Sequence, residues 1–520
     1  MSTVQPIVRN FSSSTVIVSR VQRFYDYPFK IFPVSCCNVT VQDTYFNDDL
    51  DENGEPLVNF YESIAGSRYF TSKVLKANAG TLVDLSAIRP KGTPGSNGMT
   101  SAGVRNFMAG YSNCNSEIRR GSAFRNGAVV LHLEASHLDL EEFLNCPNSE
   151  IPWCKRCVTV NPGWMDAPYY PLLEAAIADG RIFLNKQQYN SRGEKLKVNV
   201  CIGIQFLSRS TCTLAHVNLG LMQSAKDIPE AYLNGAKDLD VIWNDFYSAW
   251  SGGMGEQMAR SANHFIDPLS DKQVGLGTLG LGNMLANFGV SYVDFTNALD
   301  AITTQQEMEA DYFNIDEPSF ASLNKKALEI AQAIVKGMEK AADYFRSKGY
   351  ERAFTIEPCA TCAFQQKDIN GFTTSPEISP PIAHPVTKVT RRTTEGGFKD
   401  YQYPENIEIA GQVPWQVYDK LCFAWQRIMD NTGLAQSISY NWWLSKPVNQ
   451  ETLEDWDKSN LKGIYYRWQE LSSDGDKTNI GMEVDKEGEE FWSIADEDDD
   501  VEEQAVICQL SSPGCASCGE

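Results

Sequence analysis

The sequence lacks the features that would place the protein in a membrane or on nucleic acid. None of its 520 residues belong to an apolar run of about 18, so no membrane span is expected. The first 20 residues lack the basic-then-apolar order of a signal peptide. The net charge is −22, which argues against a broad basic face for duplex nucleic acid. A local pocket of backbone N–H groups and a few arginines could still bind a small anion.

Regular cysteine spacing is also absent. The 14 cysteines are scattered through a long chain, which favours reduced thiols in the cytoplasm, with any disulfide transient and catalytic. Strand-like and helix-like segments alternate, so the fold class is predicted to be α/β. No internal repeat is visible. A chain with 42% hydrophobic residues could form one large barrel-type core or two to three ordinary domains.

The C-terminal segment differs from the rest of the chain. From about Asp474 it is acidic and too poor in apolar residues to order itself, so we expect a flexible tether. It ends with Cys515 and Cys518 in a C-x-x-C pair. A dithiol on a mobile tail suits thiol–disulfide exchange. The alternative is half of a zinc site, for which only Cys508 lies near.

A second C-x-x-C pair, Cys154 and Cys157 with Cys146 nearby, could hold zinc or could be incidental loop cysteines. The sequence "VGLGTLGLG" contains G-x-G-x-x-G, but no apolar strand precedes it and no acidic residue follows at a ribose position. We therefore interpret its glycines as sites of close helix packing.

Three further segments contain reactive groups but have ordinary interpretations as well. Cys201 and Cys212 lie in runs that predict buried strands, where a free thiol is usually a small apolar residue. "EPCATCAF" (357–364) predicts a helix N-terminus that could bind phosphate or simply be capped. "LKGIYYRW" (461–468) contains two adjacent tyrosines, as many half-buried strands do.

In their order along residues 32–520, these segments together resemble the large, catalytic subunit of class I ribonucleotide reductase. The matching segments are "PVSCCNVTVQD", "IRPKGTPG", "FRNGAVVLHLEASHLDLEEFL", "VNVCIGI", "CTLAHVNLG", "KQVGLGTLGLGNMLANFGVSY", "EPCATC", "KGIYYRW" and the terminal cysteine pair. The resemblance implies a short N-terminal segment (1–31), a ten-stranded α/β barrel with a central finger loop and effector loops (32–473), and the flexible acidic tail (474–520).

The resemblance also implies a thiyl-radical mechanism for reducing ribonucleotides to deoxyribonucleotides, the activity of a ribonucleoside-diphosphate reductase, although the sequence does not distinguish diphosphate from triphosphate substrates. Cys201, at the tip of the finger loop, would become the thiyl radical and take the 3′ hydrogen of the substrate. Asn199 would hydrogen-bond the ribose. Cys36 and Cys212 would supply two reducing equivalents and form a disulfide. Cys515 and Cys518 would reduce that disulfide and be reduced in turn by a thioredoxin or glutaredoxin.

Other roles follow from the same resemblance. Tyr465 and Tyr466 would relay the oxidising equivalent from a separate radical-generating subunit, which carries the radical cofactor, so this chain is expected to bind no cofactor or metal itself. A homodimer is expected, with a nucleoside triphosphate effector at its interface. The residues at the substrate-phosphate positions are Ser35, Thr361 and Cys362, and those at the effector positions are Asp43, Arg89 and Arg125.

The first redox cysteine is either Cys36 or Cys37. The family places this cysteine seven residues before the effector-site acid, and counting back from Asp43 gives Cys36, which also follows a serine.

The sequence departs from the family pattern in two ways. The family loop reads N-x-C-x-E, where the glutamate is the general base for the 3′-hydroxyl, and Gly203 stands at that position. Gln205 is nearby but is no base, so another group or a water would have to act. The family also has a helical domain, and often an ATP cone, before the first redox cysteine, and the 35 residues before Cys36 are too few to form them. We therefore expect a phage-type enzyme in the host cytoplasm, or a split subunit whose N-terminal helices lie on a separate chain.

Two alternatives remain open at the level of sequence. The chain could be an adenosylcobalamin-dependent reductase, which the terminal C-x-x-C would suit equally. It could also be a catalytically impaired nucleotide-binding or assembly protein that kept the barrel and lost the base.

Overall fold

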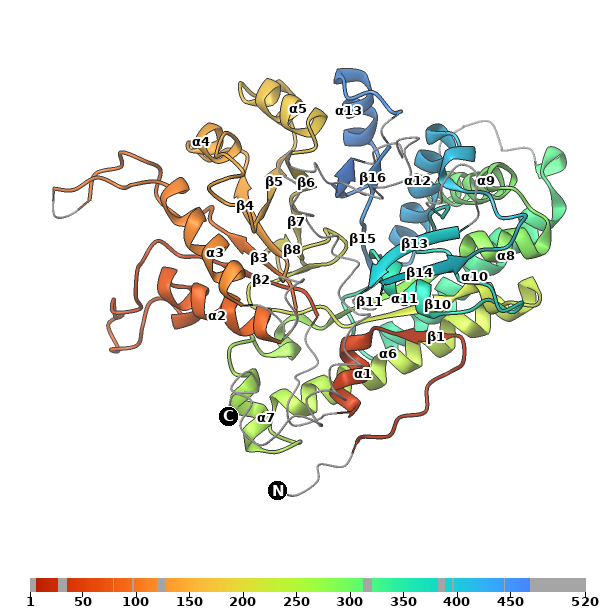
Figure 1. The fold of residues 1–520 in the computed structure, drawn as a ribbon, viewed down its shortest axis with the longest axis horizontal. Helices are drawn as coiled ribbons and strands as arrows, with labels where there is room; N and C mark the ends of the chain where they lie inside the picture. The colour runs from red at the N-terminus through yellow and green to blue at the C-terminus, as the bar shows by residue number, and fades with distance from the viewer. Residues whose placement is uncertain are drawn as a thin grey trace.

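Two parallel β-sheets with helices on their outer sides form the centre of the molecule (Figure 1). The computed structural model describes residues 6–26, 35–77, 79–95, 98–118, 127–311, 320–381, 389–394, 397–443 and 445–467. Most of the buried apolar residues form one large core cluster that includes side chains of both sheets, so the sheets belong to one folded unit.

The first sheet contains five parallel strands in sequential order. They are β2 (Cys37–Thr40), β3 (Thr81–Asp84), β4 (Val129–Glu134), β5 (Lys155–Val160) and β6 (Phe183–Lys186), and the short β17 (Gly463–Ile464) joins β6 antiparallel. The connections contain α2 (Ile64–Lys76), α3 (Arg105–Glu117), α4 (Leu140–Leu144) and α5 (Tyr170–Ala178). Helical crossovers bury a parallel sheet on both faces, which explains why these strands are almost continuously buried.

The second sheet contains four parallel strands and one antiparallel edge. The parallel strands are β10 (Leu214–Asn218), β11 (Gln273–Leu279), β12 (Arg352–Ile356) and β15 (Ala435–Ile438), and β1 (Thr15–Ile17) pairs antiparallel with β10. The main helices of this half are α6 (Ile228–Trp250), α7 (Glu256–Ala262), α8 (Leu281–Phe288), α9 (Tyr292–Asp311), α10 (Lys325–Ser347) and α12 (Trp415–Asn431).

Shorter elements complete the described part of the chain. They are α1 (Ser19–Asp26), α11 (Ala360–Gln365), α13 (Gln450–Lys458), the hairpin of β13 (Val389–Thr394) and β14 (Gly397–Gln402), the parallel pair of β16 (Asn441–Trp442) and β18 (Tyr466–Arg467), and the three-stranded sheet of β7 (Gln188–Tyr189), β8 (Lys195–Val198) and β9 (Gln205–Phe206). No helix in the described ranges is both long and apolar enough to span a bilayer.

The two sheets meet where β2 begins. An isolated antiparallel bridge joins Cys37 to Thr211, just before β10. The β8–β9 hairpin also contacts both sheets: Asn38 of β2 donates to the Lys197 carbonyl at 3.3 Å, and the Gln205 N–H donates to the Gln436 side chain of β15 at 3.0 Å. The hairpin tip is thereby held between the sheets.

The predicted α/β barrel-type fold is confirmed. The described residues show five parallel strands in one sheet and four in the other, where the resemblance implied ten in all. The N-terminal segment is integrated into the second sheet through β1, and Arg9 pairs with Asp245 of α6 at 2.7 Å. The acidic tail from residue 474 lies outside the described residues.

The interpretation of the glycine-rich motif as a helix-packing segment is wrong for two of its glycines. Gly275 and Gly277 lie within β11, and only Gly280 precedes a helix, α8. A Cβ on Gly275 would lie 2.5 Å from Leu214 Cδ2 and 2.7 Å from both Ile204 Cδ1 and Thr355 Cγ2. The absence of a side chain therefore lets the hairpin tip approach the strand.

Substituting Gly275 tests this close approach. Gly275→Ala places a methyl group in space that three side chains already fill, so we expect it to lower the free energy of unfolding by about 1–3 kcal/mol. Urea denaturation measures this change. Gly411→Ala is the matched control, because no atom lies within 4 Å of its added Cβ. Equal stability of the two variants would contradict the packing described here.

Candidate active site

The tip of the β8–β9 hairpin, residues 199–204, brings Cys201 into the interior. The Asn199 N–H donates to the Ile204 carbonyl at 2.9 Å and closes the turn. Ile202 has φ +65°, which is strained for a β-branched residue. Such strain persists only where surrounding contacts hold it in place.

Those contacts come from the ends of β12 and β15. The Gly203 carbonyl accepts hydrogen bonds from the Ser437 N–H and the Thr355 hydroxyl, both at 2.9 Å. The Ser439 hydroxyl donates to the Cys201 carbonyl at 2.6 Å. The backbone on both sides of Ile202 is therefore fixed by the second sheet.

Three thiols from separate segments meet beside this tip. Side-chain hydrogen bonds link Cys36 to Cys201 and to Cys212, and all three residues are buried. The Cys212 N–H also donates to the Cys36 carbonyl at 3.0 Å. Cys36 and Cys212 stand next to the bridged antiparallel pair Cys37 and Thr211. Residues opposite each other in such a pair have Cα atoms about 4.5–5.5 Å apart, which is within the range that a disulfide can bridge. The structure thus brings together the three cysteines that the resemblance singled out.

Cys36 and Cys37 have different surroundings. Cys37 is in β2, and its thiol donates to the Gly80 carbonyl at 3.6 Å, away from the other two thiols. Burial raises its pKa. For Cys36, hydrogen bonds from Cys201 and Cys212 instead lower the pKa. The geometry therefore supports Cys36 as the redox partner of Cys212.

A buried carboxylate that the sequence analysis did not single out lies beside the thiols. Glu357 directly follows β12, and Oε1 accepts a hydrogen bond from Asn199 Nδ2 at 2.9 Å. The Cys201 thiol also hydrogen-bonds this carboxyl group. Burial, followed by the charge of Cys36, raises the pKa of Glu357 to about 8. The signal available in the sequence was an acidic residue directly after the short apolar run "AFTI".

The predicted substrate-phosphate residues lie close in sequence to the site residues: Ser35 directly precedes Cys36, and Thr361 and Cys362 lie in α11, shortly after Glu357. Ser35 and Cys362 are buried, and Thr361 is in the short helix α11, although its side chain is outside the described part of the structure. The Cys359 N–H at the start of α11 already donates to Glu377 Oε1 at 3.0 Å. Burial raises the pKa of Glu377 to about 7.

The tyrosine segment runs alongside the hairpin tip. Gly463 packs against Ile202 so closely that a Cβ there would overlap the Ile202 side chain. The Tyr465 ring is buried, and its N–H donates to the Tyr440 carbonyl at 2.7 Å. Tyr466 begins β18, and its side chain is outside the described residues. The two tyrosines therefore follow a segment in contact with the Cys201 loop.

The predicted effector residues are far more exposed. Arg89 and Asp43 form an ion pair with each other, and Arg125 lies outside the described residues. In the described part of the chain, no contact links this pair directly to the thiol cluster.

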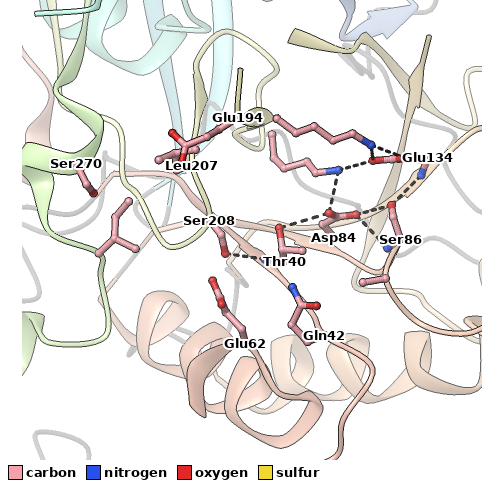
Figure 2. Close-up of a pocket in the computed structure, with 14 residues that line it drawn as sticks. Thr40, Gln42, Glu62, Asp84, Ser86, Glu134, Glu194, Leu207, Ser208 and Ser270 are labelled. Atoms are coloured by element: carbon pink, nitrogen blue, oxygen red, sulfur yellow. Dashed lines mark hydrogen bonds and ion pairs between the residues drawn. The ribbon is translucent and has the colours of Figure 1, made fainter. Parts of the chain in front are cut away.

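A pocket of about 650 Å³ lies at the opposite end of β2 from Cys36 (Figure 2). Lys197 pairs with Asp84 at 3.0 Å and with Glu134 at 2.9 Å, and Lys195 also pairs with Glu134. Because both lysines on its wall are neutralised, the pocket offers no surplus positive charge for a phosphate. The thiols are not among the residues that line it.

Within the described ranges, no three His, Cys, Asp or Glu side chains are arranged to hold a metal ion. This includes Cys146, Cys154 and Cys157, and Cys157 lies in β5 rather than in a loop. Cys515 and Cys518 lie outside the described residues.

Gln205, considered as a replacement for the missing glutamate, donates instead to Asn185 Oδ1 at 3.3 Å.

The buried glutamates predict a pH dependence of stability. Their pKa values of about 8 and about 7 lie above the ordinary value of 4.5, so between these values the folded protein binds more protons than the unfolded chain. The free energy of unfolding should therefore fall as pH rises from about 5 to 8, by up to about 1.4 kcal/mol per pH unit for each carboxyl group. In Glu357→Gln, residue 357 cannot ionise, so the free energy of unfolding should fall less over this pH range than in the wild type. Urea denaturation at several pH values measures the difference. An unchanged pH slope in the variant would contradict the assignment.

The comparisons with known proteins agree with this geometry. Residues 34–165 match the family model of the ribonucleotide reductase barrel domain. No curated protein matches the sequence. Among solved structures, the class Id ribonucleotide reductase alpha subunit of Actinobacillus ureae is similar, with a TM-score of 0.59 and 15% identity over 87% of each chain. Identity this low shows a shared fold alone. The predicted resemblance is confirmed: residues 34–165 match the barrel domain of ribonucleotide reductases, and the chain shares the fold of a class I alpha subunit.

Proposed function

We propose that this chain reduces ribonucleotides to deoxyribonucleotides by a thiyl-radical mechanism, as the catalytic subunit of a class I-like ribonucleoside-diphosphate reductase. The observation that carries the proposal is the meeting of Cys36, Cys201 and Cys212 in one buried cluster. A single buried thiol is usually structural, but three thiols from separate segments in mutual hydrogen bonding can transfer both a hydrogen atom and a pair of electrons.

In this mechanism, a radical-generating partner subunit oxidises Cys201 by one electron with loss of its proton. The resulting thiyl radical takes the hydrogen atom from the 3′ carbon of the ribose. Cys36 and Cys212 then supply two electrons and two protons as the 2′-hydroxyl leaves as water, and the two thiols become a disulfide. The hydrogen atom finally returns from Cys201 to the 3′ carbon.

The remaining roles are proposed on the same basis. Tyr465 and Tyr466 relay the oxidising equivalent from the partner, consistent with the contact between Gly463 and the hairpin tip. Asp43, Arg89 and Arg125 bind a nucleoside triphosphate effector at a homodimer interface. Ser35, Thr361 and Cys362 hold the substrate phosphate.

The alternative is a nucleotide-binding protein without catalytic activity, which Gly203 favours because no general base projects from the loop. The test is formation of deoxycytidine diphosphate from cytidine diphosphate by the full chain, supplied with dithiothreitol and a class I radical-generating subunit. Turnover supports the proposal. Nucleotide binding without turnover under every radical source would support the alternative.

Neighbouring cysteines provide a matched pair of variants. Cys36→Ala removes one member of the redox pair, so multiple turnover with dithiothreitol should fall to background. Cys37→Ala removes a thiol that bonds the Gly80 carbonyl and the Thr81 side chain rather than the other two thiols, so turnover should persist. Deoxynucleotide formation measures both. The reverse pattern would assign the redox role to Cys37.

The terminal dithiol predicts a reductant-dependent defect. A Cys515→Ser/Cys518→Ser variant should lose turnover with thioredoxin or glutaredoxin, because the internal disulfide is buried and a protein reductant cannot reach it. Turnover with dithiothreitol, which is small enough to enter, should remain. Full activity of the variant with thioredoxin would refute the shuttle role.

A further inference from the structure

Glu357 and Gly203 share one space in the site. A Cβ built on residue 203 would overlap Glu357 Oε1 and lie 2.6 Å from Glu357 Cδ and 2.9 Å from Ser439 Oγ. The Glu357 carboxyl group therefore stands where a side chain of residue 203 would begin. Any residue other than glycine at position 203 would have to displace it.

The carboxyl group is positioned by groups of the candidate active site alone. Asn199 Nδ2 donates to Oε1 at 2.9 Å, the Cys201 thiol hydrogen-bonds the same group, and only 2% of the residue is exposed. Among the residues that the structure describes, no lysine, arginine or histidine pairs with Glu357. A structural carboxylate buried this deeply would normally have a cationic partner.

We infer that Glu357 is the general base of this active site, acting on the ribose hydroxyl next to the carbon from which Cys201 takes hydrogen. The inference rests on the proposed function. The catalytic carboxylate comes from the end of β12 rather than from the hairpin, and Gly203 leaves the room that it needs.

Glu357 holds the proton of the 3′-hydroxyl for part of the reaction. As the hydrogen atom leaves the 3′ carbon for the Cys201 sulfur, the O–H bond of the 3′-hydroxyl breaks and its proton goes to Glu357. The electron pair of that bond stays on the oxygen. The proton returns to the oxygen once the 3′ carbon regains its hydrogen atom. The one-electron oxidant that forms the Cys201 radical is the radical-generating subunit.

The surroundings give Glu357 a suitable proton affinity. Burial raises its pKa to about 8, close to neutral working conditions, where a general base is most effective. The titratable groups around it are Cys36, Cys201, Cys212, Cys359 and Glu377. Turnover should therefore rise with pH up to about 8 in the wild type, and this rise should be absent in Glu357→Gln.

Nucleotide binding tests the contact without a radical partner. The probes are cytidine diphosphate and 3′-deoxycytidine diphosphate, titrated calorimetrically into the reduced full chain. At a pH of about 9, above the pKa of Glu357, the wild type should bind the 3′-hydroxyl form at least about 10-fold more tightly, as expected for a hydrogen bond to a charged group. Glu357→Ala should lose this preference. Asp240→Asn, which changes a buried carboxylate of α6 bonded to Tyr344 and Tyr350, should keep it.

Turnover provides the second measurement. Glu357→Gln, which preserves shape, should slow deoxynucleotide formation by about 10²–10⁴-fold. In Glu357→Ala/Gly203→Glu the carboxylate projects from the hairpin into the vacated space, and turnover should recover relative to Glu357→Ala. Thermal melting of each variant verifies folding.

The outcomes separate the two proposals. A wild type that binds neither nucleotide and forms no deoxynucleotide would overturn the proposed function and this inference together. A wild type that turns over, with Glu357→Gln equally fast and no preference for the 3′-hydroxyl, would overturn the role of Glu357 alone.

Discussion

The site depends on the absence of a side chain at position 203. Because Gly203 has no Cβ, the hairpin tip can lie against the end of β12, where its carbonyl accepts hydrogen bonds from Thr355 and Ser437. The same vacancy admits the Glu357 carboxyl group. Fixing the carbonyl of residue 203 also fixes Cys201, two residues earlier, against Cys36. The position of the thiol cluster therefore follows from a contact between one glycine and one strand end.

This interior has an unusual charge balance. It contains two buried glutamates and four thiols, and burial raises the pKa of both carboxyl groups toward neutrality. Natural proteins seldom bury carboxyl groups without cations, because desolvation opposes their ionisation. Such groups cluster at functional sites, where a shifted proton affinity serves the chemistry at a cost in stability. The strained backbone of Ile202 at the hairpin tip is a second cost of the same kind.

Much of this architecture could be predicted from the sequence, since it depends on local signals. The apolar periodicity and the asparagine cap mark α10, and alternating strand and helix patterns mark an α/β fold. The order of the cysteine motifs pointed to the correct barrel. The glycines of β11 were misassigned, because close approach to a neighbour has the same sequence signature in a strand as at a helix. Glu357 was missed for a related reason: its partner at position 203 lies 154 residues away, and only the folded chain brings them together.

Gly203 at first suggests a lost base, but the geometry supports a different interpretation. Two glutamates could not occupy positions 203 and 357 together, because the Cβ of one would overlap the carboxyl oxygen of the other. Even with room for both, two carboxylates in one buried site would repel, so one of the two groups would stay protonated. A single carboxylate beside Cys201 can thus be supplied from the loop or from the strand end, but not from both. With Glu357 in place, glycine at position 203 is a requirement of the site rather than a defect in it.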